Sequence, residues 1–122
     1  MPVALPAAAA ISADPIFQLI EAHRAAFAAW MVALTLQNRL EQTDDRKAAW
    51  EVVEKPGLDA NDAFDALVTE PATTMPGLVA KLAYLQELWV DDETGWLIDD
   101  CVHPTDLINS FAASVRIIGG LA

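Results

Sequence analysis

The sequence predicts an all-α fold in which one long helix forms part of an antiparallel helical hairpin and shorter helices complete a small bundle. Residues 14–40 carry the longest uninterrupted helical pattern in the chain. Later segments also repeat apolar residues at intervals of three and four, and none alternates apolar and polar residues as a strand does. At 122 residues we expect a single domain that is large enough to have its own core.

Residues 1–13 are predicted to lie outside that domain, which would then span residues 14–122. They look like the second half of an export leader, because small apolar residues lead to Ile11-Ser12-Ala13, a small-x-small pattern. Two alternatives stay open, since no Lys or Arg precedes Arg24. The segment is either the remnant of a leader, which implies a periplasmic protein, or an apolar tail of a cytoplasmic one. Pro2 and Pro6 argue against an ordered helix here.

The long helix is expected to start at Asp14, a good N-cap, with Pro15 in the first helical position. From Ala25 to Leu34 no residue is polar. Such a segment needs covering on nearly every face, either by the rest of the chain or by a second copy. We therefore predict a two-fold dimer through residues 25–36. The apolar positions fall into two rows at helical spacing: Ile16, Ile20, His23, Phe27, Trp30 and Leu34, and Leu19, Ala26, Ala33 and Leu40.

Beyond Leu40 the helix either continues or is restarted by Asp44 or Asp45. Pro56-Gly57 predicts a helix end, because proline lacks the N–H that the helix needs. A short helix over 59–69 follows, whose apolar face consists of Ala60, Phe64, Leu67 and Val68.

Two further helices are predicted, over 75–90 and 105–118. Thr73 or Thr74 caps the first of them, which we expect to be the antiparallel partner of the long helix, with Leu82 near the centre of its apolar stripe. The glycines at 119–120 end the second. The expected buried faces are Leu78, Leu82, Leu85 and Trp89, and Leu107, Ile108, Phe111, Ala112, Val115 and Ile118.

Composition excludes some classes of function. The chain has 18 acidic and 7 basic residues and a net charge of −11, which argues against nucleic-acid binding, because that depends on Lys and Arg. The apolar run in the long helix is shorter than the roughly 20 residues of a membrane span, so none is expected. A single cysteine, Cys101, excludes an intrachain disulfide, and no phosphate-binding glycine loop or other cofactor motif is present.

Glu21, His23 and Arg24 are the candidate ligand-binding residues. A helical di-metal site needs Glu and His three positions apart, whereas Glu21 and His23 are two apart and point about 200° away from each other. Glu21 and Arg24 fit a surface ion pair better. His23 fits a core or interface histidine with one hydrogen-bond partner, and a ligand contact is the less favoured alternative.

Asp99, Asp100, His103 and Asp106 are the candidate metal ligands. They belong to an acidic segment, 91–106, in a stretch from Leu82 to Val115 without Lys or Arg. An EF-hand is excluded, because counting from Asp91 the glycine falls at the fifth position instead of the sixth. A solvated acidic loop is the commoner meaning of such a run. The neighbouring Cys101 and His103 do not indicate a catalytic pair, because such pairs are brought together by the fold.

Two stretches resemble a group of small uncharacterised alphaproteobacterial proteins. They are DPIFQLIEAHRAAFAAW at 14–30 and EPATTMPGLVAKLAYLQEL at 70–88, about a third of the chain. The resemblance implies a helical fold and a bacterial source, and it supplies no activity. The residues that carry it are Asp14, Pro15, Glu21, His23, Arg24, Pro71, Thr73 and Thr74.

We therefore expect a non-enzymatic helical interaction module that associates with itself as a homodimer. The alternative is a protein that binds a small ligand or a metal through His23 or the acidic segment at 91–106.

Overall fold

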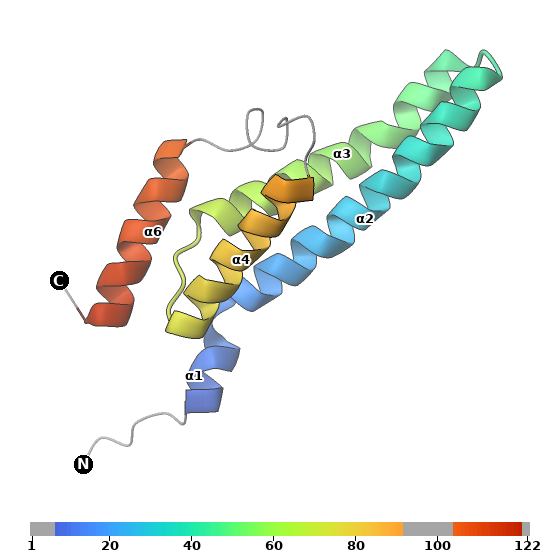
Figure 1. Cartoon of the computed structure of the whole chain (residues 1–122). Coiled ribbons are helices and arrows are strands. Elements are labelled where there is room, and N and C mark those ends of the chain that lie inside the picture. The colour runs from blue at the N-terminus through green and yellow to red at the C-terminus, as the bar shows by residue number, and fades with distance from the viewer. Residues whose placement is uncertain (1–6, 92–103, 121–122) are drawn as a thin grey trace.

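The computed structural model describes residues 7–91 and 104–120 (Figure 1). Within these ranges all regular structure is helical, with no strand, so the predicted all-α class and helical hairpin are confirmed. The elements are α1 (Ala7–Ala13), α2 (Pro15–Gln42), α3 (Arg46–Thr69), α4 (Met75–Asp91) and α6 (Pro104–Gly119).

α1 differs from the prediction that Pro2 and Pro6 oppose an ordered helix in this segment. Both prolines precede the helix, which begins at Ala7, so they leave its hydrogen bonds intact. The Asp14 N–H donates to the Ile11 carbonyl at 3.1 Å and so joins the end of α1 to the start of α2. The leader interpretation of residues 1–13 stays a prediction.

α2 and α3 form the hairpin, joined by only the three residues Thr43–Asp45. Asp44 has φ of 64°, a left-handed conformation that Asp tolerates, and it reverses the chain direction. The Asp45 side chain accepts from the Ala48 N–H at 3.1 Å and caps α3. Of the two alternatives beyond Leu40, the restart by a capping aspartate is therefore confirmed.

The predicted helix end at Pro56-Gly57 is wrong, because α3 runs through both residues to Thr69. An interior proline costs about 3 kcal/mol, but α3 packs on α2 both before and after it, through Ala49 and Ala60. Gly57 has a packing role, since a Cβ there would lie 3.3 Å from the Trp30 indole nitrogen. The predicted 59–69 helix is thus the second half of α3, and its predicted apolar face is buried as expected.

α4 lies parallel to α2, which corrects the prediction that these two helices form the antiparallel pair. The contacts between the two helices follow the same order along both. Asp14 contacts Thr74 where the helices start, and His23 contacts Tyr84 further along each helix. The reason is the order of the chain. With α3 continuous, α2, α3 and α4 run up, down and up, and α6 returns beside α3 and α4 (Figure 1).

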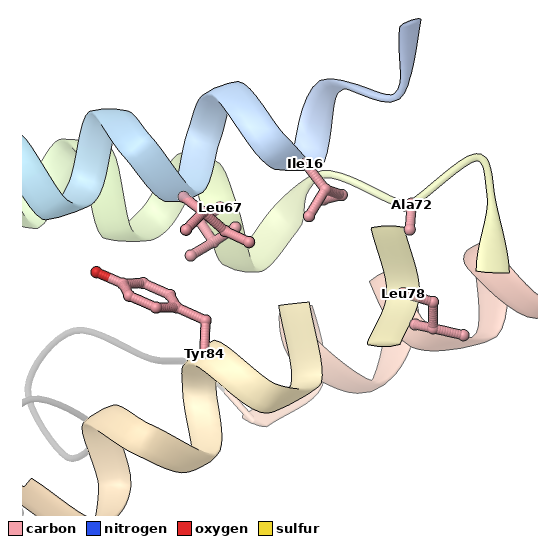
Figure 2. Close-up of a cluster of buried hydrophobic side chains, with 6 residues drawn as sticks. Ile16, Leu67, Ala72, Leu78 and Tyr84 are labelled. Carbon is pink, nitrogen blue, oxygen red and sulfur yellow. The ribbon is translucent and has the colours of Figure 1, made fainter. Parts of the chain in front are cut away.

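The core lies where these helices meet. Figure 2 shows Tyr84 reaching from α4 toward Leu67 of α3, with Ile16 of α2 and Leu78 of α4 on the same cluster. Phe64 and Val68 form a second cluster against Leu107 of α6. Burial of these side chains supplies most of the stabilisation, at roughly 1.5–3 kcal/mol each.

Asp14 is buried and binds the starts of two helices. Its Oδ1 accepts from the Ile16 N–H at 3.1 Å, which caps α2 as predicted. Its Oδ2 accepts from the Thr73 and Thr74 N–H groups and from the Thr74 hydroxyl, at 3.1, 2.9 and 2.7 Å. A Cβ on Gly77 would lie 1.9 Å from that oxygen, so glycine is required there.

Lys81 is buried beside α6, and its ammonium donates three hydrogen bonds. They go to the carbonyls of Val68 and Glu70, at 3.0 and 2.8 Å, and to the Ser110 hydroxyl, at 3.0 Å. These carbonyls end α3, where the helix dipole favours a cation. One side chain thus holds α3, α4 and α6 together.

α4 and α6 are therefore rotated from the predicted orientations. Leu82 is 43% exposed, while Lys81 and Tyr84 are buried in its place. The side chain of Trp89 lies outside the described part. In α6 the buried residues are Ser110 and Ser114. Their hydroxyl oxygens accept hydrogen bonds from the Lys81 ammonium and from the Ala72 N–H, respectively. Three residues of the predicted inner face are exposed instead: Ile108, Phe111 and Val115.

The molecule divides along its length into two regions. In the bundle half, residues 15–28 of α2 and 58–69 of α3 pack with α4 and α6. In the arm, residues 29–42 of α2 and 46–57 of α3 extend as two helices beyond α4 and α6 (Figure 1). The only buried residues in the arm are Ala33 and Ala49.

Candidate functional site

The predicted ligand-binding residues lie where α2 passes α4. His23, on the inner face of α2, shares a hydrogen bond of 2.5 Å between its Nδ1 and the Tyr84 hydroxyl. Both side chains are buried, and the His23 ring packs 5.7 Å from Phe27 and 5.2 Å from Phe64, centre to centre. His23 is thus the core histidine with one hydrogen-bond partner that its position in the apolar row indicated.

Burial keeps this pair neutral. Desolvation lowers the pKa of His23 below its usual value of 6.5. Desolvation also raises the pKa of Tyr84 to about 12, and the nearby Arg24 offsets part of that effect. Near pH 7 the contact is therefore a hydrogen bond between a neutral imidazole and a phenol. Among the residues that the structure describes, His23 Nε2 has no hydrogen-bond partner, which is unusual for a buried nitrogen.

Arg24 lies outside this pair and covers it. Its guanidinium is 4.8 Å from the centre of the Tyr84 ring, a cation–π distance. It is also 3.6 Å from a Glu21 carboxylate oxygen and 3.9 Å from one of Glu87. The predicted ion pair of Glu21 and Arg24 is confirmed, although exposed pairs of this kind contribute at most about 1 kcal/mol.

A pocket of about 330 Å³ opens beside these residues. His23 does not line it, so the orphan Nε2 and the pocket are separate features. The lining has one cation and one carboxylate, which are already paired, and no Ser, Cys or His that would act as a nucleophile or base. Its lining residues are Arg24, Phe27, Ala28, Tyr84, Glu87 and Leu88.

Of the predicted metal ligands, Asp99, Asp100 and His103 lie outside the described residues. Asp106 is in the first turn of α6, where its negative charge interacts favourably with the helix dipole. Within residues 7–91 and 104–120, no three His, Cys, Asp or Glu side chains gather as a metal site would require.

The second candidate surface is apolar and extends over the arm. Val32 and Trp50 are 71% and 69% exposed, and Leu36 and Leu58 are exposed as well. A pocket of about 400 Å³ opens between Trp30 of α2 and Trp50 of α3. Exposed large apolar side chains at this density make the arm the second candidate for an interaction surface.

Tyr84 and Lys81 are the residues that sequence reasoning missed. The available signal was their spacing, since Leu78, Lys81 and Tyr84 follow one another at intervals of three and so fall within an arc of about 120° on α4. Lysine is rarely buried, so the usual burial preferences favour the face through Leu82 over the face that carries Lys81.

Comparison with known proteins adds nothing to this geometry: no family model matches the chain, and neither the curated proteins nor the solved structures contain a match. The resemblance to the alphaproteobacterial group therefore stays a prediction. By length and composition α2 would be able to cross a membrane, a property shared by core helices of soluble proteins and by signal sequences near an N-terminus.

Proposed function

We propose that this protein is a non-enzymatic helical module that associates with itself through a bare face of α2. The observation that carries the proposal is a row of exposed apolar residues along α2, which we name the α2 seam. Its members are Ala22, Ala25, Ala29, Val32 and Leu36.

The spacing of the seam supports a helical partner. Its residues follow one another at intervals of three, four, three and four, the repeat that lets one helix pack along another. Ala25 and Ala29 are each two residues from a core position, His23 and Phe27, and therefore point about 200° away from the side that faces α4. Three alanines leave room for two backbones to approach closely.

Insertion of α2 into a membrane is the competing explanation of its apolar surface. α3 packs along α2 and carries eight charged side chains: Arg46, Lys47, Glu51, Glu54, Lys55, Asp59, Asp62 and Asp65. Placing the hairpin in a bilayer would bring several of these charges into the hydrocarbon, at a cost of about 2.5–3.5 kcal/mol each near its centre. This cost favours a protein partner.

Light scattering behind a sizing column tests the proposal. We expect a dimer mass at tens of micromolar for the unaltered chain. Ala29→Glu, which would place an unpaired charge in the middle of the interface, should give a monomer with unchanged helical circular dichroism. Ala83→Glu makes the same change at an exposed position of α4 and should remain dimeric. A monomer mass for the unaltered chain contradicts the proposal, and binding to lipid vesicles instead would favour the membrane explanation.

A small-ligand site beside Tyr84 is a second candidate, favoured by the pocket of about 330 Å³ that Arg24, Tyr84 and Glu87 line. A thermal-shift screen with divalent metals and small organic compounds tests it, because a ligand that binds only the native state raises the melting temperature. Any hit should be lost in Tyr84→Phe, whereas a hit that survives this change binds elsewhere.

A further inference from the structure

We infer that two copies pair their α2 seams in antiparallel orientation, about a two-fold axis that passes between the two α2 helices, level with Trp30 and Met31. This inference rests on the proposed self-association and adds its geometry. It follows from the sizes of the seam residues and from the charges at the two ends of the seam.

The sizes of the side chains favour the antiparallel register. The seam is small at its N-terminal end, with Ala22 and Ala25, and large at its C-terminal end, with Val32 and Leu36. Antiparallel pairing sets Ala29 against the partner's Val32, and Ala25 against the partner's Leu36, so each layer holds one small and one large residue. Parallel pairing would stack alanine on alanine at one end and leucine on leucine at the other, which cannot keep an even spacing between the helices.

The charges favour the same register. Arg39 is three residues after Leu36 and continues the seam, and it is exposed without an ion pair to any described residue. In the antiparallel register Arg39 lies beside the partner's Ala22 and its neighbour Glu21. The Glu21 side chain is 76% exposed, so its carboxylate can contact the partner's Arg39 while it keeps its 3.6 Å ion pair with Arg24. Parallel pairing would set Arg39 against the partner's Arg39.

This arrangement also places the arm. Residue 36 of one copy lies level with residue 25 of the other, so each arm extends along the bundle half of its partner. The paired stretch runs from Ala22 to Arg39 and is about 26 Å long, at 1.5 Å per residue. A contact of this length between two helices is at the small end of specific interfaces, so we expect a dimer that dissociates on dilution.

Disulfide trapping tests the orientation. Ala25→Cys and Leu36→Cys are made separately in a chain that also carries Cys101→Ser, and the two variants are oxidised alone and as a mixture. In the antiparallel register like positions are about 16 Å apart along the axis, too far for a disulfide, whereas positions 25 and 36 meet. Only the mixture should therefore give a cross-linked dimer, and it should contain one chain of each variant.

The other outcomes separate the two proposals. Cross-links from either variant alone indicate a parallel pair and overturn the inference, while self-association stands. A dimer mass without any cross-link means that the seam is not the interface, and this overturns the inference together with the proposed interface. A monomer mass ends both.

Charge reversal provides a test that does not depend on oxidation. Arg39→Glu should raise the dissociation constant of the dimer about three- to tenfold, and combining it with Glu21→Arg should restore the original value. Arg116→Glu, in the last turn of α6, is the matched control and should leave the dissociation constant unchanged. Failure of the double variant to recover would contradict the antiparallel register.

Discussion

The bundle half and the arm are made from the same two helices, yet they bury very different side chains. In the bundle half, Phe64 and Leu67 of α3 are at most 1% exposed. In the arm, Trp50 of the same helix is 69% exposed. The difference is the presence of α4 and α6, which cover the hairpin only as far as α4 reaches. A two-helix hairpin alone cannot enclose a core, so the arm depends on the bundle half and, in our proposal, on a second copy.

The largest test of this comparison removes one aromatic side chain from each region. Phe64→Ala should lower the free energy of unfolding by about 3–5 kcal/mol, because it leaves a cavity in a packed core. Trp50→Ala should change it by less than about 1 kcal/mol, because most of that side chain is already in water. Urea unfolding followed by circular dichroism measures both. Similar losses for the two variants would mean that the arm has a core of its own.

A smaller effect comes from the buried lysine of the bundle half. Desolvation lowers the pKa of Lys81 from 10.5 to about 8. Between these values the unfolded chain binds more protons than the folded one, so stability should rise with pH, by about 3 kcal/mol at most. The window to measure is pH 8 to 10, because above it the raised pKa of Tyr84 acts in the opposite direction.

The control for this pH dependence is Lys81→Met, which keeps the length of the side chain and removes the titrating group. Its free energy of unfolding should be lower at pH 8, since the Val68 and Glu70 carbonyls lose their donor. It should also be flat between pH 8 and 10. An equal rise in both proteins would assign the titration to another group.

The smallest expected change in the free energy of unfolding comes from Leu82, and it tests which face of α4 is covered in the bundle half. Leu82→Ala should cost about 1 kcal/mol or less, because Leu82 is 43% exposed. Leu78→Ala, at the buried position one turn earlier, should cost about 2–5 kcal/mol. Thermal unfolding of the two variants gives the comparison, and a reversed order would show that α4 is rotated toward the orientation predicted from its leucines.

Much of the fold could be predicted from the sequence where local chemistry decides it. The start of α2 follows from Asp14 and Pro15, and the buried face around Phe64 follows from helical spacing. Local rules failed at Pro56, where packing on both sides outweighs the cost of an interior proline. A helix that ends at Pro56 is too short to pair with the whole of α2, so the sequence pattern favours the 75–90 helix as the antiparallel partner, whereas the continuous α3 makes α4 run parallel to α2.

The candidate site was less predictable, because it depends on polar groups that satisfy one another across long distances in sequence. Burying Ser110 and Ser114 makes sense only when Lys81 and the Ala72 N–H are known to lie opposite. The partner of His23 is Tyr84, 61 residues away, and nothing local indicates that pairing. The ion pair of Glu21 and Arg24 was predicted correctly, because the two residues lie three positions apart, within one turn of the same helix.

The Asp14 carboxylate has a consequence for the order of folding. It accepts hydrogen bonds from Thr73 and Thr74, 59 and 60 residues later, whereas α2 and α3 are joined by only three residues. Closing the short loop costs less chain entropy, so the hairpin should form first and Asp14 should engage later. In pulse-labelled hydrogen exchange during refolding, we expect the amides of Thr73 and Thr74 to gain protection after those within α2 and α3. The N-terminal end of α2 then receives its final hydrogen bonds only after α4 has docked.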